Sequence, residues 1–309
     1  MGPVMRIAIV GVGKIARDQH VPAIAAVPGL DLVATASRHG TVAGVPAFPS
    51  LEALLAEGPA FDAVALCTPP QVRRTQAALA LASGKHVLLE KPPGATVAEI
   101  APLADAARAA GVTLFASWHS RFAPAVEPAR AFLEAHPPRA ATILWKEDVR
   151  HWHPGQDWIW QPGGLGVFDP GINALSILTR ILPRPVFLQQ AELSFPANRA
   201  APIAAELSFS DGRELVVQAS FDWRQTGPQT WDILLDTEAG QLVLTRGGAA
   251  LLLDGRTLLD EEKAEYPGLY RRFAELVAQG GSEVDLQPLV HVADAFMLAR
   301  RRTVEAFDD

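Results

Sequence analysis

About the first 120 residues alternate between short apolar runs and longer stretches rich in alanine and leucine, and this alternation limits the fold more than any other feature. Short apolar runs with β-branched residues near their centres are typical of strands that are buried on both faces. The runs span residues 7–10, 30–36, 64–67, 87–89 and 112–116. Strands that alternate with helices predict βαβ units, and hence an α/β domain with a doubly wound parallel sheet.

The pattern changes after residue 121, where runs of alternating polar and apolar residues take over. Such runs indicate a mostly antiparallel sheet with one covered face, and Asp211-Gly212 between two of them is a hairpin signal. Helices are expected over residues 169–181 and, at the end of the chain, over about 286–307. The terminal helix is a candidate to pack back on the first domain. The sequence therefore predicts two domains, which comprise residues 1–121 and an α+β domain of residues 122–309.

The chain is acidic, with a formal net charge of −7, and contains a single cysteine, Cys67. The negative charge argues against nucleic acid and anionic membranes as partners, and no apolar run reaches the roughly 18 residues that a membrane span needs. One cysteine cannot form an internal disulfide, which fits a reducing compartment. We expect a cytoplasmic protein with Cys67 as a buried core residue.

The turn after the first predicted strand reads Gly11-Val12-Gly13-Lys14-Ile15-Ala16, which matches G-x-G-x-x-G/A. In this pattern Gly11 permits the tight turn, Gly13 lets a pyrophosphate approach the main chain, and Ala16 keeps the following helix close to the sheet. The N-terminus of that helix offers free N–H donors to the phosphates. We therefore predict a dinucleotide site that includes Gly11, Gly13, Lys14 and Ile15.

The end of the second predicted strand lacks the acidic residue that binds the ribose 2′-hydroxyl of NAD. It reads Ala36-Ser37-Arg38-His39 instead. The guanidinium of Arg38 can pair with a 2′-phosphate and Ser37 can hydrogen-bond to it. We therefore expect Ser37, Arg38 and His39 to line a site that favours NADP, although the loss of the acid does not itself exclude NAD.

A third motif, Glu90-Lys91-Pro92, follows the predicted strand that ends at Leu89, and Thr68-Pro69-Pro70 follows the strand before it. With the glycine turn and the antiparallel second half, these motifs make nearly the whole chain resemble the Gfo/Idh/MocA oxidoreductase family. The resemblance implies a Rossmann domain, a second domain for substrate binding and oligomerisation, and a lysine, Lys91, near the nicotinamide. It adds Thr68, Pro69, Glu90 and Lys91 to the cofactor residues. An open sheet with one bare apolar face also indicates a homodimer.

Within the family, residues 13–20, 145–150, 152–156 and 163–176 are similar to a branch of bacterial aldose 1-dehydrogenases for L-arabinose and D-galactose. Members of that branch oxidise the anomeric carbon to a lactone. One helix departs from the wider family, whose pattern of aspartate, histidine and aspartate reads Asp169, Asn173 and Ser176 here. Asn173 cannot titrate, so the acid–base role of that histidine does not carry over to it.

Oxidation of a sugar at C1 requires that the C1 hydroxyl lose a proton and that the developing oxyanion be stabilised. Asp169 and Asn173 are four residues apart and share one face of the predicted helix. This makes Asp169 the expected base and Asn173 an orienting hydrogen-bond partner. Lys91 is the candidate for stabilising the oxyanion and handling the proton, and both Lys91 and Glu147 stay open as alternative bases. Three glycines precede Asp169 and are expected to let the chain pass close to a ligand. They are Gly163, Gly164 and Gly166.

Four tryptophans lie within residues 145–160, which is a high local density of rings that can stack on the C–H faces of a sugar. The expected substrate residues are His119, Glu147, Trp152, His153, Asp169 and Asn173. No metal site is expected, because His151 and His153 have no third ligand at suitable spacing.

Three functions fit these features. The first is an aldose 1-dehydrogenase that prefers NADP; the second is an inositol or polyol dehydrogenase of the same family, against which Asn173 argues mildly. The third is a nicotinamide-sensing regulatory protein without catalysis, against which Lys91 and Asp169 argue. L-Arabinose, D-galactose and D-fucose stay open as substrates, because a change at C5 usually alters binding by only ~1–3 kcal/mol.

Overall fold

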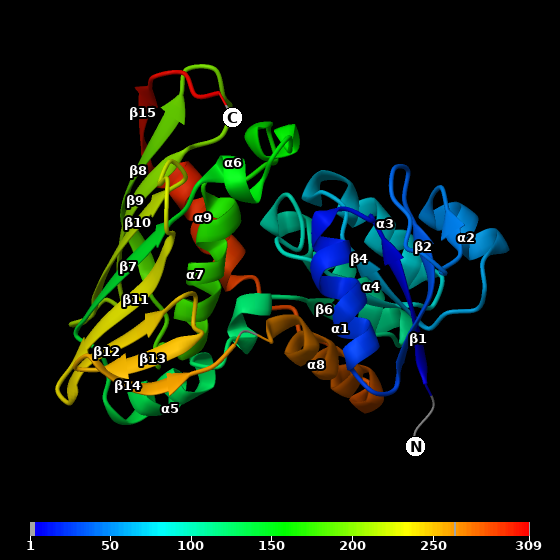
Figure 1. Ribbon diagram of the computed structural model, residues 1–309, viewed down its shortest axis with the longest axis horizontal. Helices are drawn as coiled ribbons and strands as arrows, with labels where there is room; N and C mark the ends of the chain where they lie inside the picture. Colours follow the sequence, from blue (N-terminus) through cyan, green and yellow to red (C-terminus); the bar gives the residue numbers. More distant parts are fainter. Residues whose placement is uncertain (1–3, 263, 309) are drawn as a thin grey trace. The chain divides into compact units, whose positions relative to one another are not determined.

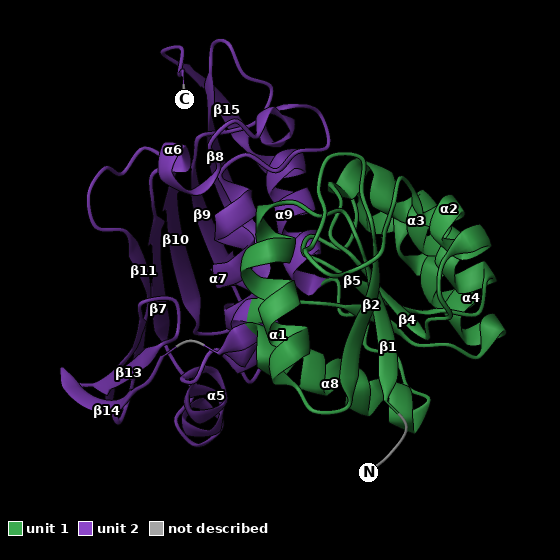
Figure 2. Ribbon diagram, turned by 45° about the vertical axis from the view of Figure 1, so that its right-hand side comes forward, with its two compact units in different colours: residues 1–119, 266–286 green, residues 120–265, 287–309 purple. Residues whose placement is uncertain are grey.

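The computed structural model describes residues 4–262 and 264–308, which form two compact units (Figure 2). The first unit contains the chain up to His119 together with Tyr266–Leu286. The second contains Ser120–Glu265 and the chain from Gln287 onward. The chain thus first passes from one unit to the other two residues before the predicted boundary. The segment Tyr266–Leu286, from the second half of the sequence, returns to the first unit.

The first unit is built on a six-stranded parallel sheet with the order β3-β2-β1-β4-β5-β6 (Figure 1). This order confirms the predicted doubly wound sheet. Its strands are β1 (Met5–Val10), β2 (Leu30–Ala36), β3 (Ala47–Phe48), β4 (Ala63–Leu66), β5 (His86–Leu89) and β6 (Leu114–Ala116). The two-residue strand β3 was not expected, because it carries no apolar run and exists only through its pairing with the end of β2.

Helices connect these strands and share a hydrophobic core with them. They are η1 (Ala16–His20), α1 (Val21–Ala26), α2 (Leu51–Glu57), α3 (Pro70–Ala82), η2 (Val97–Glu99), α4 (Ala101–Ala110) and α8 (Glu265–Gln279). One core cluster joins alternate residues of the strands, such as Val10 and Leu66, to Leu54 of α2, Leu81 of α3 and Leu103 of α4. The sheet is therefore sealed on this face by helices from three successive βα units.

The second unit is built on a nine-stranded sheet with the order β14-β13-β12-β11-β7-β10-β9-β8-β15. Its strands are β7 (Ala140–Lys146), β8 (Phe187–Pro196), β9 (Ala204–Ser210), β10 (Val216–Asp222), β11 (Thr230–Thr237), β12 (Gly240–Thr245), β13 (Ala250–Leu253), β14 (Arg256–Asp260) and β15 (Arg300–Val304). Two neighbouring pairs are parallel, β7 with β10 and β8 with β15, and the others are antiparallel. The predicted open, mostly antiparallel sheet is confirmed, with the hairpin at Asp211-Gly212 between β9 and β10.

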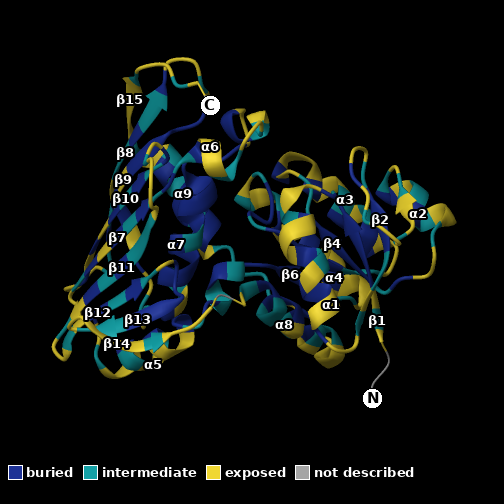
Figure 3. Ribbon diagram, viewed as in Figure 1, coloured by how far each residue is buried: buried dark blue, intermediate teal, exposed yellow. Residues whose placement is uncertain are grey.

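The long helix of the second unit is α7 (Phe168–Ile181), which is buried along most of its length (Figure 3). The other helical segments are η3 (His119–Phe122), α5 (Val126–Ala135), α6 (Val149–Trp152), η4 (Asp157–Trp160) and α9 (Gln287–Leu298). A Cβ atom on Gly171 of α7 would lie 2.6 Å from the ring of Phe221 on β10. Glycine at this position therefore lets α7 pack directly on the sheet.

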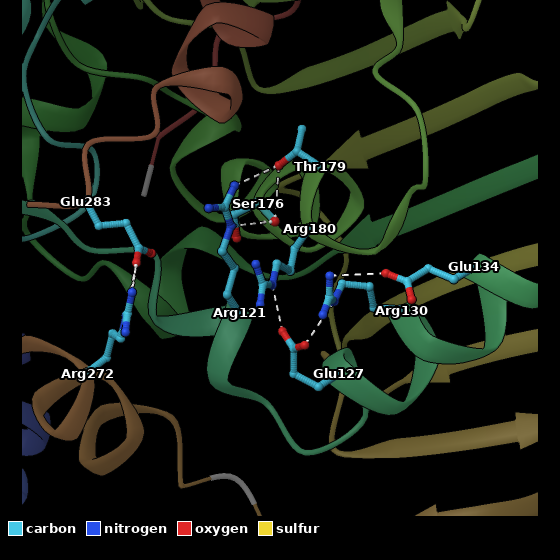
Figure 4. Close-up of polar contacts among 9 residues, drawn as sticks. All are labelled: Arg121, Glu127, Arg130, Glu134, Ser176, Thr179, Arg180, Arg272 and Glu283. Carbon is cyan, nitrogen blue, oxygen red and sulfur yellow. Dashed lines mark hydrogen bonds and ion pairs between the residues drawn. The ribbon is translucent and has the colours of Figure 1, made fainter. Parts of the chain in front are cut away.

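Polar contacts fix the outer part of α7 (Figure 4). Arg121 donates to the carbonyl oxygen of Ser176 and to Oγ1 of Thr179, each at 3.0 Å. Glu127 of α5 accepts from Arg180 of α7 at 2.6 Å, and the same carboxylate accepts from Arg130 at 3.0 Å. The helix that carries Asp169 and Asn173 is thus held at both its buried face and its exposed end.

The predicted terminal helix over residues 286–307 is wrong beyond Leu298, where α9 ends and β15 follows. Residues 300–304 pair with the edge of β8, whose free main-chain groups outweigh the helix preference of the three arginines in this short segment. Helix α9 packs against α7 and β8 and belongs to the second unit, and the helix that joins the first unit is α8. Among the described residues, no helix combines the length and apolar character that crossing a membrane requires.

Candidate active site

The glycine turn after β1 has the conformation that the fingerprint requires. Gly11 has a φ of +90°, and a Cβ atom there would lie 2.8 Å from the main-chain nitrogen of Thr68. Its own N–H donates to the carbonyl oxygen of Ala36 at 2.8 Å. Only glycine lets the chain leave β1 this close to the loop after β4.

The space beside the turn fits a dinucleotide. A Cβ atom on Gly13 would meet no atom of the chain within 4 Å, and helical structure starts at Lys14 and continues to Ala26. Lys14 and Ile15 thus form the first turn of a helix whose N–H groups are available for phosphate oxygens. The residues present therefore suit the pyrophosphate of a bound dinucleotide.

The Ser37-Arg38-His39 segment follows β2 and stays close to the glycine turn. The N–H of Ser37 donates to the carbonyl oxygen of Phe48 at 2.9 Å, and Arg38 and His39 are exposed. A Cβ atom on Gly40 would lie 2.2 Å from the carbonyl oxygen of Val12. The loop therefore returns against the fingerprint, which leaves the Arg38 side chain accessible to a ligand bound at this edge.

The Glu90 carboxylate is buried, with 3% of the residue exposed. It accepts from Nε2 of His20 at 2.9 Å and from the hydroxyl of Tyr266 at 3.4 Å. Nδ1 of His20 lies 2.8 Å from the hydroxyl of Tyr270. Glu90, His20, Tyr266 and Tyr270 are here called the His20 cluster, and their contacts occupy the Glu90 carboxylate.

Charge stabilises the His20 cluster. Burial alone would raise the pKa of Glu90, but the hydrogen bond and charge of His20 outweigh it and lower the pKa to about 2. Burial alone would lower the pKa of His20, but Cys67, Tyr270 and Glu90 together raise it well above its usual value. Burial raises the pKa of Tyr270 to about 12, so this hydroxyl stays protonated. At neutral pH the cluster holds an imidazolium–carboxylate pair between two phenols.

The His20 cluster is expected to make stability fall as pH rises above about 6.5. The folded chain keeps the His20 proton at a pH where the unfolded chain, with the ordinary histidine pKa of 6.5, has released it. The free energy of unfolding should then fall by up to ~1.4 kcal/mol per pH unit, whereas the Glu90 contribution is lost only as pH drops from 4.5 towards 2. Urea unfolding between pH 5.5 and 8.5 measures the slope.

His20→Gln removes the titrating group, so it should lose this slope and, at pH 6, about 3–5 kcal/mol of stability, since it also breaks the buried pair with Glu90. His136→Gln, at a histidine paired with Glu238 outside the cluster, should keep the slope. An unchanged slope in His20→Gln would contradict the assignment to His20.

The motif residues Thr68, Pro69, Lys91 and His119 follow the carboxyl ends of β4, β5 and β6, which is the edge where ligands bind in parallel sheets. Lys91 is half-buried, and the ring of His119 stacks on that of Tyr266 with centroids 5.1 Å apart. Cys67 lies at the same edge and is half-buried, so the expectation of a fully buried core residue is wrong. It stands one residue beyond the end of β4, where the core gives way to the loop.

The second unit contains Asp169, the predicted base, and Asn173, its predicted orienting partner. Asp169 lies in the first turn of α7 and only 3% of it is exposed. Its Oδ2 is 3.3 Å from Nε2 of His153, and Nδ1 of His153 lies 3.4 Å from Oε1 of Gln156. Asn173 follows one helical turn later and is half-buried. The structure thus brings together His153 and Asp169, which the sequence had placed in the site separately.

Glu147 directly follows β7 and is buried, with 4% exposed. Its Oε1 accepts from the indole nitrogen of Trp223 at 3.2 Å, and its Oε2 accepts from that of Trp231 at 2.8 Å. The Trp231 ring lies beside Trp152, with centroids 5.4 Å apart. Glu147 therefore fixes two indoles, one of which borders the predicted substrate residue Trp152.

The glycines before α7 serve the fold of the second unit. A Cβ atom on Gly164 would lie 2.3 Å from the carbonyl oxygen of Trp158, and one on Gly166 would lie 2.3 Å from that of Pro202. The expectation that these two glycines make room for a ligand is therefore wrong. They make room for neighbouring main chain, which sets the start of α7.

Sequence reasoning missed His20, Tyr266 and Tyr270 around Glu90, and Trp223 and Trp231 around Glu147. One signal was present: the chain has only two tyrosines, and they stand four residues apart, on one face of a helix. Within residues 4–262 and 264–308, no group of three or more histidine, cysteine, aspartate or glutamate side chains could hold a metal ion.

Comparison with known proteins agrees with this architecture. Residues 5–117 match the model of the GFO_IDH_MocA oxidoreductase family, which describes an NAD-binding Rossmann fold. Galactose 1-dehydrogenase from Pseudomonas fluorescens is 48% identical over 305 residues, which cover 99% of both chains. The chain belongs to this oxidoreductase family.

Two solved structures extend the likeness to both units. The crystal structure of a D-galactose 1-dehydrogenase from Rhizobium etli has a TM-score of 0.94 and 61% identity, and the match covers 100% of this chain and 99% of that one. A 3-ketoreductase from Actinomadura kijaniata, solved with NADP, has a TM-score of 0.85 at 20% identity, and the match covers 98% and 100% of the two chains. At that identity the likeness shows the fold alone.

Proposed function

We propose that this chain is an aldose 1-dehydrogenase that oxidises D-galactose, L-arabinose and sugars of similar ring stereochemistry to their lactones, with NADP preferred over NAD. The observation that carries the proposal is the buried Asp169 carboxylate, with His153 at 3.3 Å and a non-titrating asparagine one turn later. Likeness to two galactose 1-dehydrogenases over 99% or more of the chain supports the substrate class.

Asp169 is the proposed general base, which takes the proton of the C1 hydroxyl as the C1–H bond breaks. His153 orients the carboxylate by its contact with Oδ2, and the Asn173 amide binds the reacting hydroxyl from the same helix face. Lys91 stabilises the developing charge on the C1 oxygen through its ammonium group. The oxidised nicotinamide, when bound, supplies the acceptor for the hydride from C1.

An absorbance assay at 340 nm tests the proposal with NADP and NAD against a panel of aldoses and polyols. Turnover of D-galactose or L-arabinose to a lactone that opens to the acid is the expected result. A ketone product from polyols alone would replace the C1 chemistry with that of a polyol dehydrogenase. No turnover with any sugar would favour a nicotinamide-sensing regulatory protein.

Arg38→Asp is expected to weaken the binding of NADP by roughly tenfold to a hundredfold and to change the binding of NAD much less, because a charge-assisted hydrogen bond contributes about 1.5–3 kcal/mol. Titration of the intrinsic tryptophan fluorescence with each nucleotide measures both dissociation constants. Arg108→Asp, on an exposed arginine of α4 paired with Asp105, makes the same charge change outside the site and should leave both constants alone. Equal losses for NADP and NAD in Arg38→Asp would refute the 2′-phosphate assignment.

The proposal includes a homodimer in the cytoplasm. Leu144, Leu234 and Val243 lie on the face of the nine-stranded sheet opposite its buried residues and are only half-covered within one chain, which favours a second copy there. Light scattering after size-exclusion chromatography gives the mass directly, and a monomer at micromolar concentration would contradict the dimer.

A further inference from the structure

A buried arginine on α3 connects two of the loops at the cofactor edge. Only 2% of Arg73 is exposed. Its Nη1 donates to the carbonyl oxygens of Glu90 and Pro92, and its Nη2 donates to the carbonyl oxygen of Thr68. These carbonyls belong to the loops that follow β5 and β4, so a single guanidinium bridges two neighbouring loops.

The two carbonyls on the β5 side stand on either side of Lys91. Fixing the carbonyls of residues 90 and 92 fixes the main chain from which the Lys91 side chain emerges. The third carbonyl, that of Thr68, belongs to the residue whose main-chain nitrogen leaves no room for a side chain at Gly11. Arg73 therefore joins the Lys91 turn to the loop that touches the dinucleotide fingerprint.

A second side chain of α3 holds the same loop. The hydroxyl of Thr68 donates to Oε1 of Gln76 at 2.5 Å, and Gln76 stands three residues after Arg73 on the helix. Taking a charged guanidinium out of water costs several kcal/mol, and an apolar side chain would fill the same volume without that cost. Unlike an apolar side chain, the planar guanidinium of arginine offers several hydrogen-bond donors in a fixed relative geometry.

We propose that Arg73 is a positioning residue for Lys91. Arg73 holds the main chain at Lys91 in a fixed position relative to the glycine turn. The inference rests on the proposed function, in which Lys91 stabilises the charge on the C1 oxygen. Under this proposal, a change at Arg73 lowers the rate of the chemical step more than it weakens the binding of the nucleotide, because the phosphates bind at Gly13 and the helix that follows.

Arg73→Lys is the direct test, since it keeps the charge and removes the fork. The expected result is a fall in kcat of about tenfold to a hundredfold, as a displacement of about 1 Å costs up to 10²-fold. The dissociation constant of NADP, measured by tryptophan fluorescence without sugar, should change less than about threefold. Wild-type kcat in Arg73→Lys, or a loss of NADP binding as large as the loss of kcat, would overturn the proposal.

Arg272→Lys is the matched control. Arg272 donates from Nε at 3.0 Å and from Nη2 at 2.9 Å to Glu283, so it is also a fork in the first unit, but it binds a carboxylate and not the carbonyls on either side of Lys91. Its kcat should be unchanged even where its melting temperature falls as far as that of Arg73→Lys. An equal fall of kcat in both variants at equal melting temperature would make Arg73 merely structural.

Two further variants keep the test decisive. If Arg73→Lys does not fold, Arg73→Ala leaves the space of the buried side chain empty, and added methylguanidinium is expected to restore part of kcat; absence of any restoration in a folded Arg73→Ala would count against the proposal. Lys91→Met separates the two hypotheses. Wild-type kcat in Lys91→Met would refute the role of the lysine, whereas an inactive Lys91→Met beside a fully active Arg73→Lys would refute only the positioning role.

Discussion

Replacing Asp169 with asparagine is expected to lower kcat by about 10²–10⁴-fold, which is the usual contribution of a general base. Asparagine has nearly the same shape and keeps a hydrogen-bond acceptor for His153, but it cannot take the proton of the C1 hydroxyl. The fold should survive, because the carboxylate contact at 3.3 Å is a small part of a helix held by Gly171, Arg121 and Glu127. Steady-state rates with a fixed saturating nucleotide give the effect.

Asp236→Asn is the control for Asp169→Asn. Asp236 is exposed near the end of β11, where it accepts from Gln241 at 2.9 Å, and its loss should leave kcat unchanged. Near-normal turnover in Asp169→Asn would move the base to Lys91 or Glu147. Glu147→Gln would then be measured next, although both Glu147 oxygens already accept from indole nitrogens.

Lys91→Met is expected to lower kcat by at least about 10²-fold, comparable with the loss of one oxyanion-hole donor. Methionine matches the length of the lysine stem but lacks the ammonium group that, under the proposed function, stabilises the developing charge. Lys91→Arg keeps a charge on a larger, planar group and should recover only a minor part of the rate. The sugar KM and kcat, together with NADP binding, separate loss of chemistry from loss of binding.

Lys85→Met is the matched control for Lys91→Met. Lys85 directly precedes β5, the strand that Lys91 follows. Its ammonium donates to the carbonyl oxygen of Phe61 at 2.8 Å and lies 4.6 Å from the centre of the Phe61 ring. This substitution is expected to cost stability and to spare kcat. Equal losses of kcat in both lysine variants would mean that the damage comes from the strand rather than from the ammonium at position 91.

The first sheet was predictable because its strands are buried on both faces and leave a strong trace in the sequence. All four residues of β4 are fully buried, and they read as an uninterrupted apolar run. Strand β3 leaves no such trace, since two residues carry no periodicity. Strand β15 contains three arginines in a row, and local sequence preference does not predict a strand there. This segment is a strand because it pairs with the free edge of β8.

The site was predictable where a motif names it and not where tertiary contacts define it. The tight turn at Gly11 and the open space beside Gly13 follow from a short pattern with a known chemistry, and the role of Lys91 stays a prediction. The direction of the Glu90 side chain depends on His20 and on Tyr270, which stands 250 residues from His20 in the chain. No local pattern reports such a pairing, and the same holds for the indoles that surround Glu147.

The return of α8 to the first unit sets an order on how this chain folds as it is synthesised. Tyr266 and Tyr270 close the His20–Glu90 pair, and Phe273 stacks on Phe115 of β6 with ring centroids 6.2 Å apart. A ribosome that has completed the six parallel strands has not yet made Tyr266, Tyr270 or Phe273. The first unit therefore becomes complete only after most of the second has been translated, so vectorial folding, unit by unit, is not open to this chain.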